Sequence, residues 1–200
     1  MIVRWALLIL GGVLLGGIVH LATVIILPRT ATQDAYARLS LIAPVNTVVA
    51  LPAPTPEKAV MPFMDPAFAS AVCRYDLSQG PLKLTVPVSP GYTSVSFYTR
   101  YDVAYYAIND RAAGRRIIEL DLMTTAQHDQ VPEDEEVTAA DRLIVESPTL
   151  TGLIAIRALA PEPGLMRVAE STVAASKCST QRPEPPRPPA RPLEPARPRK

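Results

Sequence analysis

The sequence predicts a mainly β (α+β) fold: an N-terminal transmembrane helix, a small antiparallel β-sandwich-like domain with two or three short helices, and a disordered polyproline tail. Three observations predict it. The 23 residues 5–27 contain no charged side chain. Short runs of alternating apolar and polar residues fill 82–159, without the long helices that parallel strands require between them. Proline occupies every third position from 183 to 198.

These patterns divide the 200 residues into four parts. We expect a transmembrane anchor at 1–28, a juxtamembrane helix with a proline-rich linker at 29–64, a β-rich domain at 65–179 and a basic polyproline tail at 180–200. The β-rich part, with roughly 110 residues, has a common domain size.

The apolar stretch 5–27 is long enough to cross a bilayer. At 1.5 Å per residue its helix spans about 34 Å, against a hydrocarbon core of about 30 Å. A cleavable signal peptide has a shorter apolar region and a small-residue cleavage site soon after it. The nearest such site, Ala35-Tyr36-Ala37, follows only after Pro28 and Arg29. We therefore predict a retained anchor with one span.

Two glycines of the anchor have the spacing of a helix-contact motif. Gly12 and Gly16 form a GxxxG pattern, which lets two membrane helices approach closely. Glycine is also frequent in membrane helices without such a role. Helix–helix contact through this face is therefore a hypothesis, and the anchor could equally serve only as a tether.

Local patterns after the anchor predict the elements of the domain. Helical spacing indicates a short juxtamembrane helix within 30–43. Asp65-Pro66 reads as an N-cap and first helical residue, which predicts a helix of one or two turns before residue 73. Thr124 and Gln127 fit a capping box before a helix at 125–130, and an alanine-rich helix is expected at 165–177. Seven strands are expected, at 46–51, 82–88, 94–99, 103–108, 117–123, 143–146 and 153–159.

Several short motifs occur in a fixed order along this part of the chain. They are Asp65-Pro66-x-Phe68, Cys73-Arg74-x-Asp76-Leu77, the SVSFY run, Tyr106-x-x-Asn109-Asp110-Arg111, Thr124-x-x-Gln127, Gly152 to Arg157 and Cys178. In these motifs, over roughly residues 15–179, the chain resembles the small single-span membrane proteins of alphaproteobacteria assigned to domain-of-unknown-function family 1254. The resemblance implies an uncharacterised envelope protein with a β-rich domain, and it brings no established catalytic residues. The tail lies outside it.

The two cysteines bracket the predicted domain. Cys73 and Cys178 would normally pair in an exported domain, whereas in a reducing compartment they would stay as two thiols. They form no CxxC motif, which disfavours a redox-active role. Basic residues flank both ends of the anchor, so the charges alone leave its orientation nearly undecided. The cysteines favour an inner-membrane protein with its C-terminal domain in the periplasm.

Four tyrosines gather within nine residues. Tyr98, Tyr101, Tyr105 and Tyr106 could line an aromatic ligand groove. Aromatic residues on neighbouring strands also pack against each other without binding anything. A small-ligand-binding module is therefore the second functional hypothesis.

Composition disfavours other kinds of chemistry. The predicted exported part has one histidine, His128, and the chain has neither a GxSxG elbow nor a glycine-rich phosphate loop. The acidic segment 129–141 lacks the spacing and the glycine turn of a calcium loop. Residues 29–181 carry 13 basic and 17 acidic side chains, a balance of −4 that argues against nucleic-acid binding. We predict no catalytic residues, no metal site, no cofactor and no enzyme activity.

The tail suggests one more contact. With three residues per turn, polyproline II would place its prolines in one stripe and its basic residues on the other faces. Residues 182–200 could be a solubilising end, or a cationic arm that touches an anionic envelope polymer, a lipid surface or an acidic partner. The first functional hypothesis is accordingly a structural or interaction role in the envelope, with a membrane protein or envelope polymer as partner.

Overall fold

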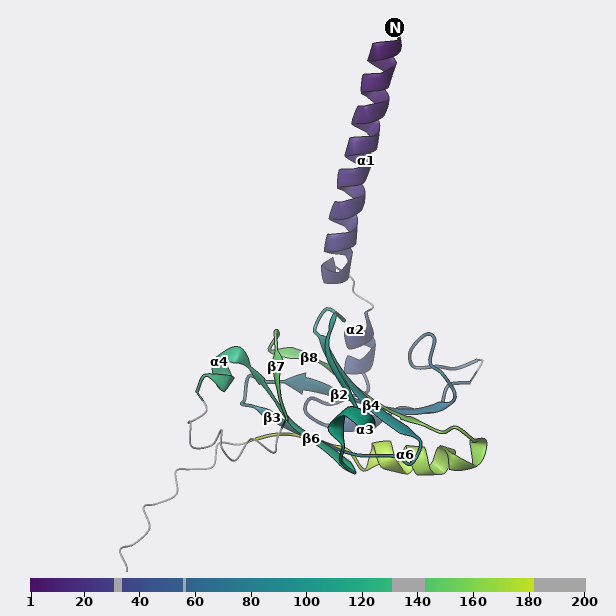
Figure 1. Ribbon diagram of the computed structural model, residues 1–200, viewed down its shortest axis with the longest axis vertical. Helices are drawn as coiled ribbons and strands as arrows, with labels where there is room; N and C mark the ends of the chain where they lie inside the picture. Colours follow the sequence, from purple (N-terminus) through teal and green to yellow (C-terminus); the bar gives the residue numbers. More distant parts are fainter. Residues whose placement is uncertain (31–33, 56, 131–142, 182–200) are drawn as a thin grey trace, which may run out of the picture.

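The computed structural model describes residues 1–30, 34–55, 57–130 and 143–181. Its first element is the helix α1, Ile2–Thr30. Within the described residues, α1 is the one helix long and apolar enough to span a membrane, over Ile2–Leu27, and none of this span is buried in the protein. Figure 1 shows it standing outside the domain. The expected apolar helix is therefore present.

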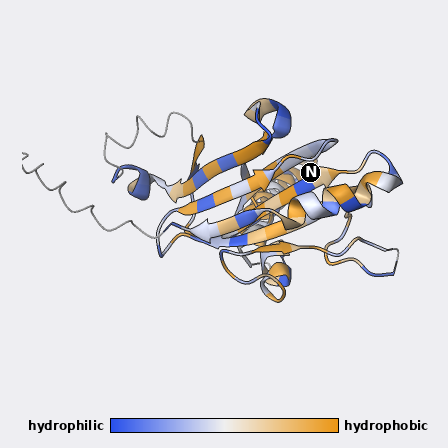
Figure 2. Cartoon of the chain, turned by 90° about the horizontal axis from the view of Figure 1, so that it is seen from below, coloured by the Kyte–Doolittle hydropathy of each residue, from blue (hydrophilic) through white to orange (hydrophobic). Residues whose placement is uncertain are grey.

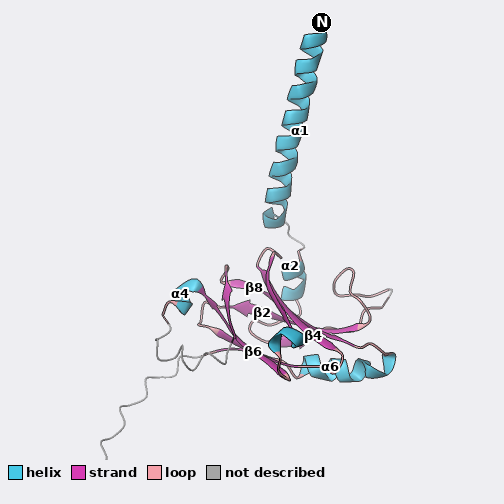
Figure 3. Ribbon diagram, in the orientation of Figure 1, coloured by secondary structure: helices cyan, strands magenta, loops and turns pink. Residues whose placement is uncertain are grey.

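Two sheets form the domain, as Figure 3 shows. One sheet has the strand order β1 (Val48–Ala50), β2 (Phe68–Asp76), β8 (Thr151–Leu159), β4 (Tyr92–Thr99) and β5 (Ala104–Asn109). The other has the order β7 (Leu143–Ser147), β6 (Ile117–Thr124), β3 (Leu82–Pro87) and β9 (Lys177–Thr180). All pairs are antiparallel except β6 and β7. The seven expected strands are all present, and β2 and β9 are additions.

The helices of the domain are short. They are α2 (Ala35–Ser40), α3 (Asp110–Ala113), α4 (Thr125–His128), a 3-10 turn (Pro163–Leu165) and α6 (Met166–Ala174). The capping box of Thr124 and Gln127 is confirmed, with both of its hydrogen bonds formed at the start of α4. The juxtamembrane and alanine-rich helices are confirmed as α2 and α6.

The helix expected after Asp65-Pro66 is wrong. Asp65 does accept a hydrogen bond from the Ala67 N–H at 2.9 Å, as in a turn, but the chain then enters β2 at Phe68. The pairing of β2 with β8 supplies nine residue pairs, from Phe68 opposite Leu159 to Asp76 opposite Thr151. This sheet pairing outweighs the weak helical preference of the local sequence.

The main core fills the space between the sheets. Side chains alternate along β3 and β4, so that every second residue is buried. Figure 2 shows the same alternation as bands of hydrophobic and hydrophilic colour along the strands. Leu82, Leu84, Phe97, Ile154 and Ile156 are fully buried there. Each such side chain contributes about 1.5–3 kcal/mol to stability.

A disulfide joins the two sheets. Cys73 lies in β2 of the five-stranded sheet and Cys178 in β9 of the four-stranded sheet, and their sulfurs are bonded with a Cα–Cα distance of 6.5 Å. The structure thus contains the expected pair, with Cys178 in a strand rather than at the end of a helix.

Part of the segment 29–64 belongs to the sheet. β1 pairs with β2 in the register Val48–Cys73 to Ala50–Ala71, so the folded unit begins before residue 65. A second apolar cluster, around Leu39 and Leu153, packs α2 against the outer face of this sheet. The polyproline repeat at 183–198 and most of the acidic segment 129–141 lie outside the described residues.

Candidate ligand pocket

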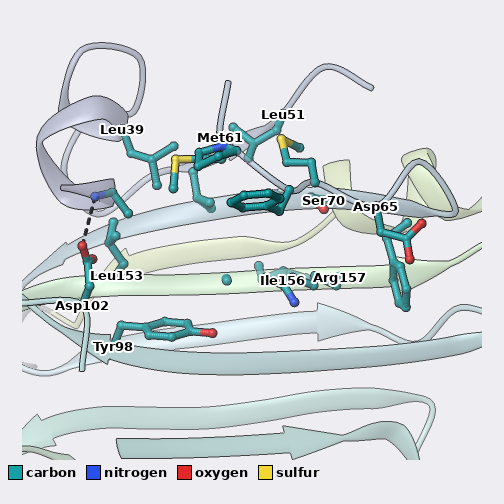
Figure 4. A pocket seen from close by; sticks show the side chains of 18 residues that line it. Leu39, Leu51, Met61, Asp65, Ser70, Tyr98, Asp102, Leu153, Ile156 and Arg157 are labelled. Atoms are coloured by element: carbon teal, nitrogen blue, oxygen red, sulfur yellow. Dashed lines mark hydrogen bonds between the residues drawn. The ribbon is translucent and has the colours of Figure 1, made fainter. Parts of the chain in front are cut away.

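A pocket of about 420 Å³ lies on the outer face of the five-stranded sheet, opposite the main core. Strands β2, β8 and β4 form its floor, and α2 together with Leu51 and residues 61–65 forms its roof (Figure 4). Most of its lining is apolar, from Leu39, Leu51, Met61, Phe68, Val72 and Leu153. Its polar side chains are Asp65, Ser70, Tyr98, Asp102 and Arg157.

Small outward-facing residues create the space. Ser70 of β2 stands opposite Arg157 of β8, and Ala155 of β8 stands between Val72 and Ser96 of the neighbouring strands. Ser70 and Ala155 both line the pocket. Because neither side chain reaches far above the sheet, a hollow stays between the floor and the roof.

The roof is attached to the sheet at its two ends. At one end the Leu51 N–H donates to the Ser70 carbonyl at 2.8 Å. At the other, Leu39 of α2 is almost fully buried in the second apolar cluster. Farther along the chain an isolated bridge pairs Thr55 with Lys58. The roof is therefore joined to the sheet both by a backbone hydrogen bond and by apolar packing.

The turn between β4 and β5 fixes the start of α2. Asp34 caps α2 by accepting the Ala37 N–H at 2.7 Å, and it also forms an ion pair with Arg100 at 2.9 Å. The Ala35 N–H donates to Asp102 at 3.0 Å. Two carboxylates thus satisfy backbone donors at this helix N-terminus, as is usual there. This closes one end of the pocket.

Burial raises the pKa of Asp102, and the nearby Asp34 charge adds to the effect, while the Ala35 N–H and Arg100 oppose it. A raised pKa means that the folded protein holds this proton more tightly than the unfolded chain. The stabilising effect of the group is therefore present at low pH and is lost as pH rises through its folded pKa.

We expect Asp102→Asn to gain stability relative to the wild type as the pH is raised from about 3 to 7, because the amide does not ionise. Asp102 has φ 59°, a conformation that asparagine also tolerates. Asp102→Ala, which tolerates it less, should be about 1–2 kcal/mol less stable than Asp102→Asn at every pH. Urea midpoints across this pH range provide the measurement, and a constant difference between Asn and Asp would contradict the expectation.

The other end of the pocket holds Asp65. Figure 4 shows Asp65 at the opposite end from Asp102, with Arg157 on the floor between them. The Asp65 carboxylate already accepts the Ala67 N–H. The two acids of the pocket are therefore not a close carboxylate pair, and the guanidinium of Arg157 is the cation of this lining.

The four tyrosines do not come together in one groove. Tyr98 lines the pocket. Tyr105 and Tyr106 pack against Phe97 with ring centroids 6.2 and 5.8 Å apart, beside the main core. Tyr101 is 45% exposed in the β4–β5 turn. A register shift between Phe97 and Tyr98 separates these positions.

A buried hydroxyl cluster lies at one end of the main core. The Tyr75 hydroxyl is 2.9 Å from the Ser147 hydroxyl, and the Tyr105 hydroxyl donates to it at 3.2 Å. Burial raises the pKa of Tyr105 above its usual range, so this phenol stays neutral. Tyr75 is fully buried, which indicates a structural cluster rather than a ligand site.

His128, the histidine considered for catalysis, lies away from the pocket. Its Nδ1 is 2.8 Å from the Glu146 carboxylate on β7, and this hydrogen bond is the main cause that lowers the pKa of Glu146. Among the described residues no three His, Cys, Asp or Glu side chains meet to hold a metal ion. Within the described part of the chain no atom lies within 4 Å of a Cβ built at Gly12 or Gly16, so their role in helix contact stays a prediction.

The comparisons with known proteins concern the same domain. The model of the family described as Protein of unknown function (DUF1254) matches residues 45–179, more than half of the chain. The chain belongs to this family. Membership confirms the family part of the resemblance, and the match begins at 45, just before β1, in agreement with the extended domain boundary.

Two solved structures resemble the fold. The VPA0106 protein from Vibrio parahaemolyticus has 14% identity and a TM-score of 0.54, over 73% of this chain and 34% of that one. A putative uncharacterized protein from Burkholderia cenocepacia has 14% identity and a TM-score of 0.39, over 56% of this chain and 31% of its own. This chain thus spans about one third of either protein. No curated protein matches it. The first likeness supports the fold alone.

Of the residues that line the pocket, sequence patterns proposed only Tyr98 as a ligand contact. Asp65 and Arg157 were named only as motif positions of the resemblance, although Arg157 is a charge in an otherwise apolar strand, at 151–159. The position of this charge could have indicated a polar group on the outer face of the sheet, since a charged side chain in such a strand must point away from the core.

Proposed function

We propose that this family member is a single-span protein of the bacterial inner membrane whose periplasmic domain binds a small amphipathic molecule in the pocket. The observation that carries the binding role is the pocket itself, with its volume of about 420 Å³ and its largely apolar lining. Ligand sites commonly have about 300–1,000 Å³, apolar walls and a few polar groups. The origin in alphaproteobacteria implied by the resemblance is part of the same proposal.

Two features support the compartment. The apolar helix α1 has the length and composition of a membrane span. The Cys73–Cys178 disulfide fits an oxidising compartment, which supports the proposal of a periplasmic domain. A contact of the basic tail with an envelope polymer, or of the anchor with another membrane protein, is compatible with this arrangement.

The polar groups of the pocket favour a ligand with an anionic end. Asp65 and Asp102 each already accept a backbone N–H. Arg157 is exposed, and its guanidinium can bind a carboxylate with two parallel hydrogen bonds. A fatty acid whose chain lies along Val72 and Leu153 and whose carboxylate meets Arg157 satisfies both kinds of lining.

We propose binding rather than catalysis. The two pocket acids lie at opposite ends, and His128 is paired with Glu146 elsewhere. An apolar pocket also supports the ligand-binding hypothesis more directly than a purely structural role, since a structural contact needs no hollow.

A photoreactive analogue of dodecanoate tests the binding role in the full-length protein reconstituted in nanodiscs. After irradiation, we expect labelling of peptides from 61–72 and 153–157, reduced by excess unlabelled dodecanoate. Ala155→Phe should lower this labelling about tenfold, because the ring fills the space above the floor. Ala107→Phe, at an exposed position of β5 outside the pocket, is the matched control and should label normally.

A charge variant tests the orientation of the ligand. Arg157→Gln should weaken labelling by the dodecanoate analogue about tenfold and leave labelling by the corresponding alcohol unchanged. Labelling spread evenly over the domain, or equal labelling of the two phenylalanine variants, would contradict the pocket as the binding site.

A further inference from the structure

We infer that one end of the five-stranded sheet rests on the lipid surface, where Tyr101, Val103 and Leu150 enter the headgroup layer. These three residues are called the apolar tip below. The inference goes beyond ligand binding and rests on only one part of the proposed function, the anchoring of α1 in a membrane.

The apolar tip is exposed in the described structure. Tyr101, Val103 and Leu150 are 45%, 56% and 55% exposed. They belong to two neighbouring turns, because Thr99 at the end of β4 pairs with Gly152 at the start of β8. Figure 1 shows these two turns on the same side of the domain as α2.

Hydrogen bonds attach the tip to the N-terminus of α2. Arg100 binds Asp34 at 2.9 Å, and Asp102 accepts the Ala35 N–H at 3.0 Å. Tyr101 lies between Arg100 and Asp102 in the sequence, so its position is fixed relative to the first residues of α2. The charges of Arg100 and Asp34 are paired with each other, which lowers the cost of bringing these two groups near a membrane.

The chain leaves little distance between this corner and the bilayer. Four residue steps separate Thr30, the last residue of α1, from Asp34, and they can extend over at most about 14 Å. Thr30 lies about 4.5 Å beyond Leu27, where the apolar span ends. Asp34 is therefore always within about 19 Å of the hydrocarbon edge, while the headgroup layer alone is about 5–7 Å thick.

A bilayer is the partner that this geometry favours. Tyrosine is enriched at membrane interfaces, where its ring is buried and its hydroxyl stays hydrated. The tether keeps the tip at a high effective concentration near the lipid, so a small apolar contact is sufficient to hold the domain down. This contact would bring the Asp102 end of the pocket toward the headgroups, since Asp102 lies between the tip residues and lines the pocket.

Tryptophan quenching tests the contact in full-length protein reconstituted into phosphatidylcholine vesicles brominated near the top of the acyl chains. The wild type has one tryptophan, Trp5, within the span, and its quenching reports insertion of the anchor. In a Trp5→Phe background, Tyr101→Trp reports the tip. Tyr92→Trp is the matched control, because Tyr92 starts the same strand, about 23 Å from Thr99.

We expect Tyr101→Trp to show blue-shifted emission and several-fold stronger quenching than Tyr92→Trp. Equal quenching of the two variants, with Trp5 of the wild type quenched, would overturn the tip contact and leave the anchor intact. A blue shift without bromine quenching would mean that protein covers the tip, and it would also overturn the inference. Unquenched Trp5 would refute the anchor and this inference with it, without bearing on the pocket.

Discussion

Gly152→Ala is expected to destabilise the domain by about 3 kcal/mol or more. A Cβ built at this position in β8 overlaps the Tyr98 carbonyl oxygen and the Tyr75 hydroxyl. Both neighbours are held in place, Tyr98 by the β4–β8 pairing and Tyr75 by its complete burial. Relief of the overlap must shift a strand or the Tyr75 ring. Overpacking of this kind costs about 1–3 kcal/mol, and a lost buried hydrogen bond about 1–3 kcal/mol more.

Gly164→Ala is the matched control for this substitution. No atom lies within 4 Å of a Cβ built at Gly164, and its φ is not in the left-handed region. Its stability should be unchanged or rise by up to about 1 kcal/mol. Urea unfolding of the full chain in mild detergent, followed by near-ultraviolet circular dichroism of the buried tyrosines, gives both values. Similar midpoints for the two variants would show that the close approach at Gly152 is unimportant.

Removal of the disulfide is the second large effect. Cys73 and Cys178 are 105 residues apart and cross-link the two sheets. We expect Cys73→Ala with Cys178→Ala to lose about 2–5 kcal/mol, chiefly because the unfolded chain gains the freedom of a long loop. Either single substitution should cost almost as much as the double, since each one breaks the same bond. Additive single effects would argue that packing at the two positions dominates instead.

The redox state in the cell tests the same bond and the proposed compartment together. Cells are quenched with acid, and free thiols are alkylated before electrophoresis with and without reductant. The wild-type protein should migrate as the oxidised form with neither thiol alkylated. Two alkylated thiols in freshly quenched cells would contradict a periplasmic domain, whatever the stability of the double variant.

The individual strands could be predicted from the sequence because each one has its own alternation of apolar and polar residues. Alternation in Leu82–Pro87 and Tyr92–Thr99 states which side chains face the core, and the structure places them so. The capping box at Thr124 and the span of α1 are equally local, the first in four residues and the second in composition. Such features need no partner elsewhere in the chain to be recognised.

Elements that depend on pairing with strands far away in the sequence could not be predicted. Residues 68–72 have a composition compatible with a helix, and only pairing with β8 makes them a strand. β9 has four residues and exists because β3 offers an edge for Cys178 to join. Four neighbouring tyrosines suggested one groove, yet the alternation of β4 puts Tyr98 on the outer face, and the register shift between β4 and β5 leaves both Tyr105 and Tyr106 beside the core.

By itself the sequence determined the apolar helix, the β-rich class of the domain and the two cysteines that join it, because periodicity, length and residue type act locally. Only the tertiary structure decided where a ligand could bind. The pocket arises where small side chains of β2 and β8, at Ser70 and Ala155, face a roof formed by α2, Leu51 and residues 61–65. The floor and the roof of the pocket come from segments that are far apart in the sequence, so the pattern of neither segment alone predicts the space between them.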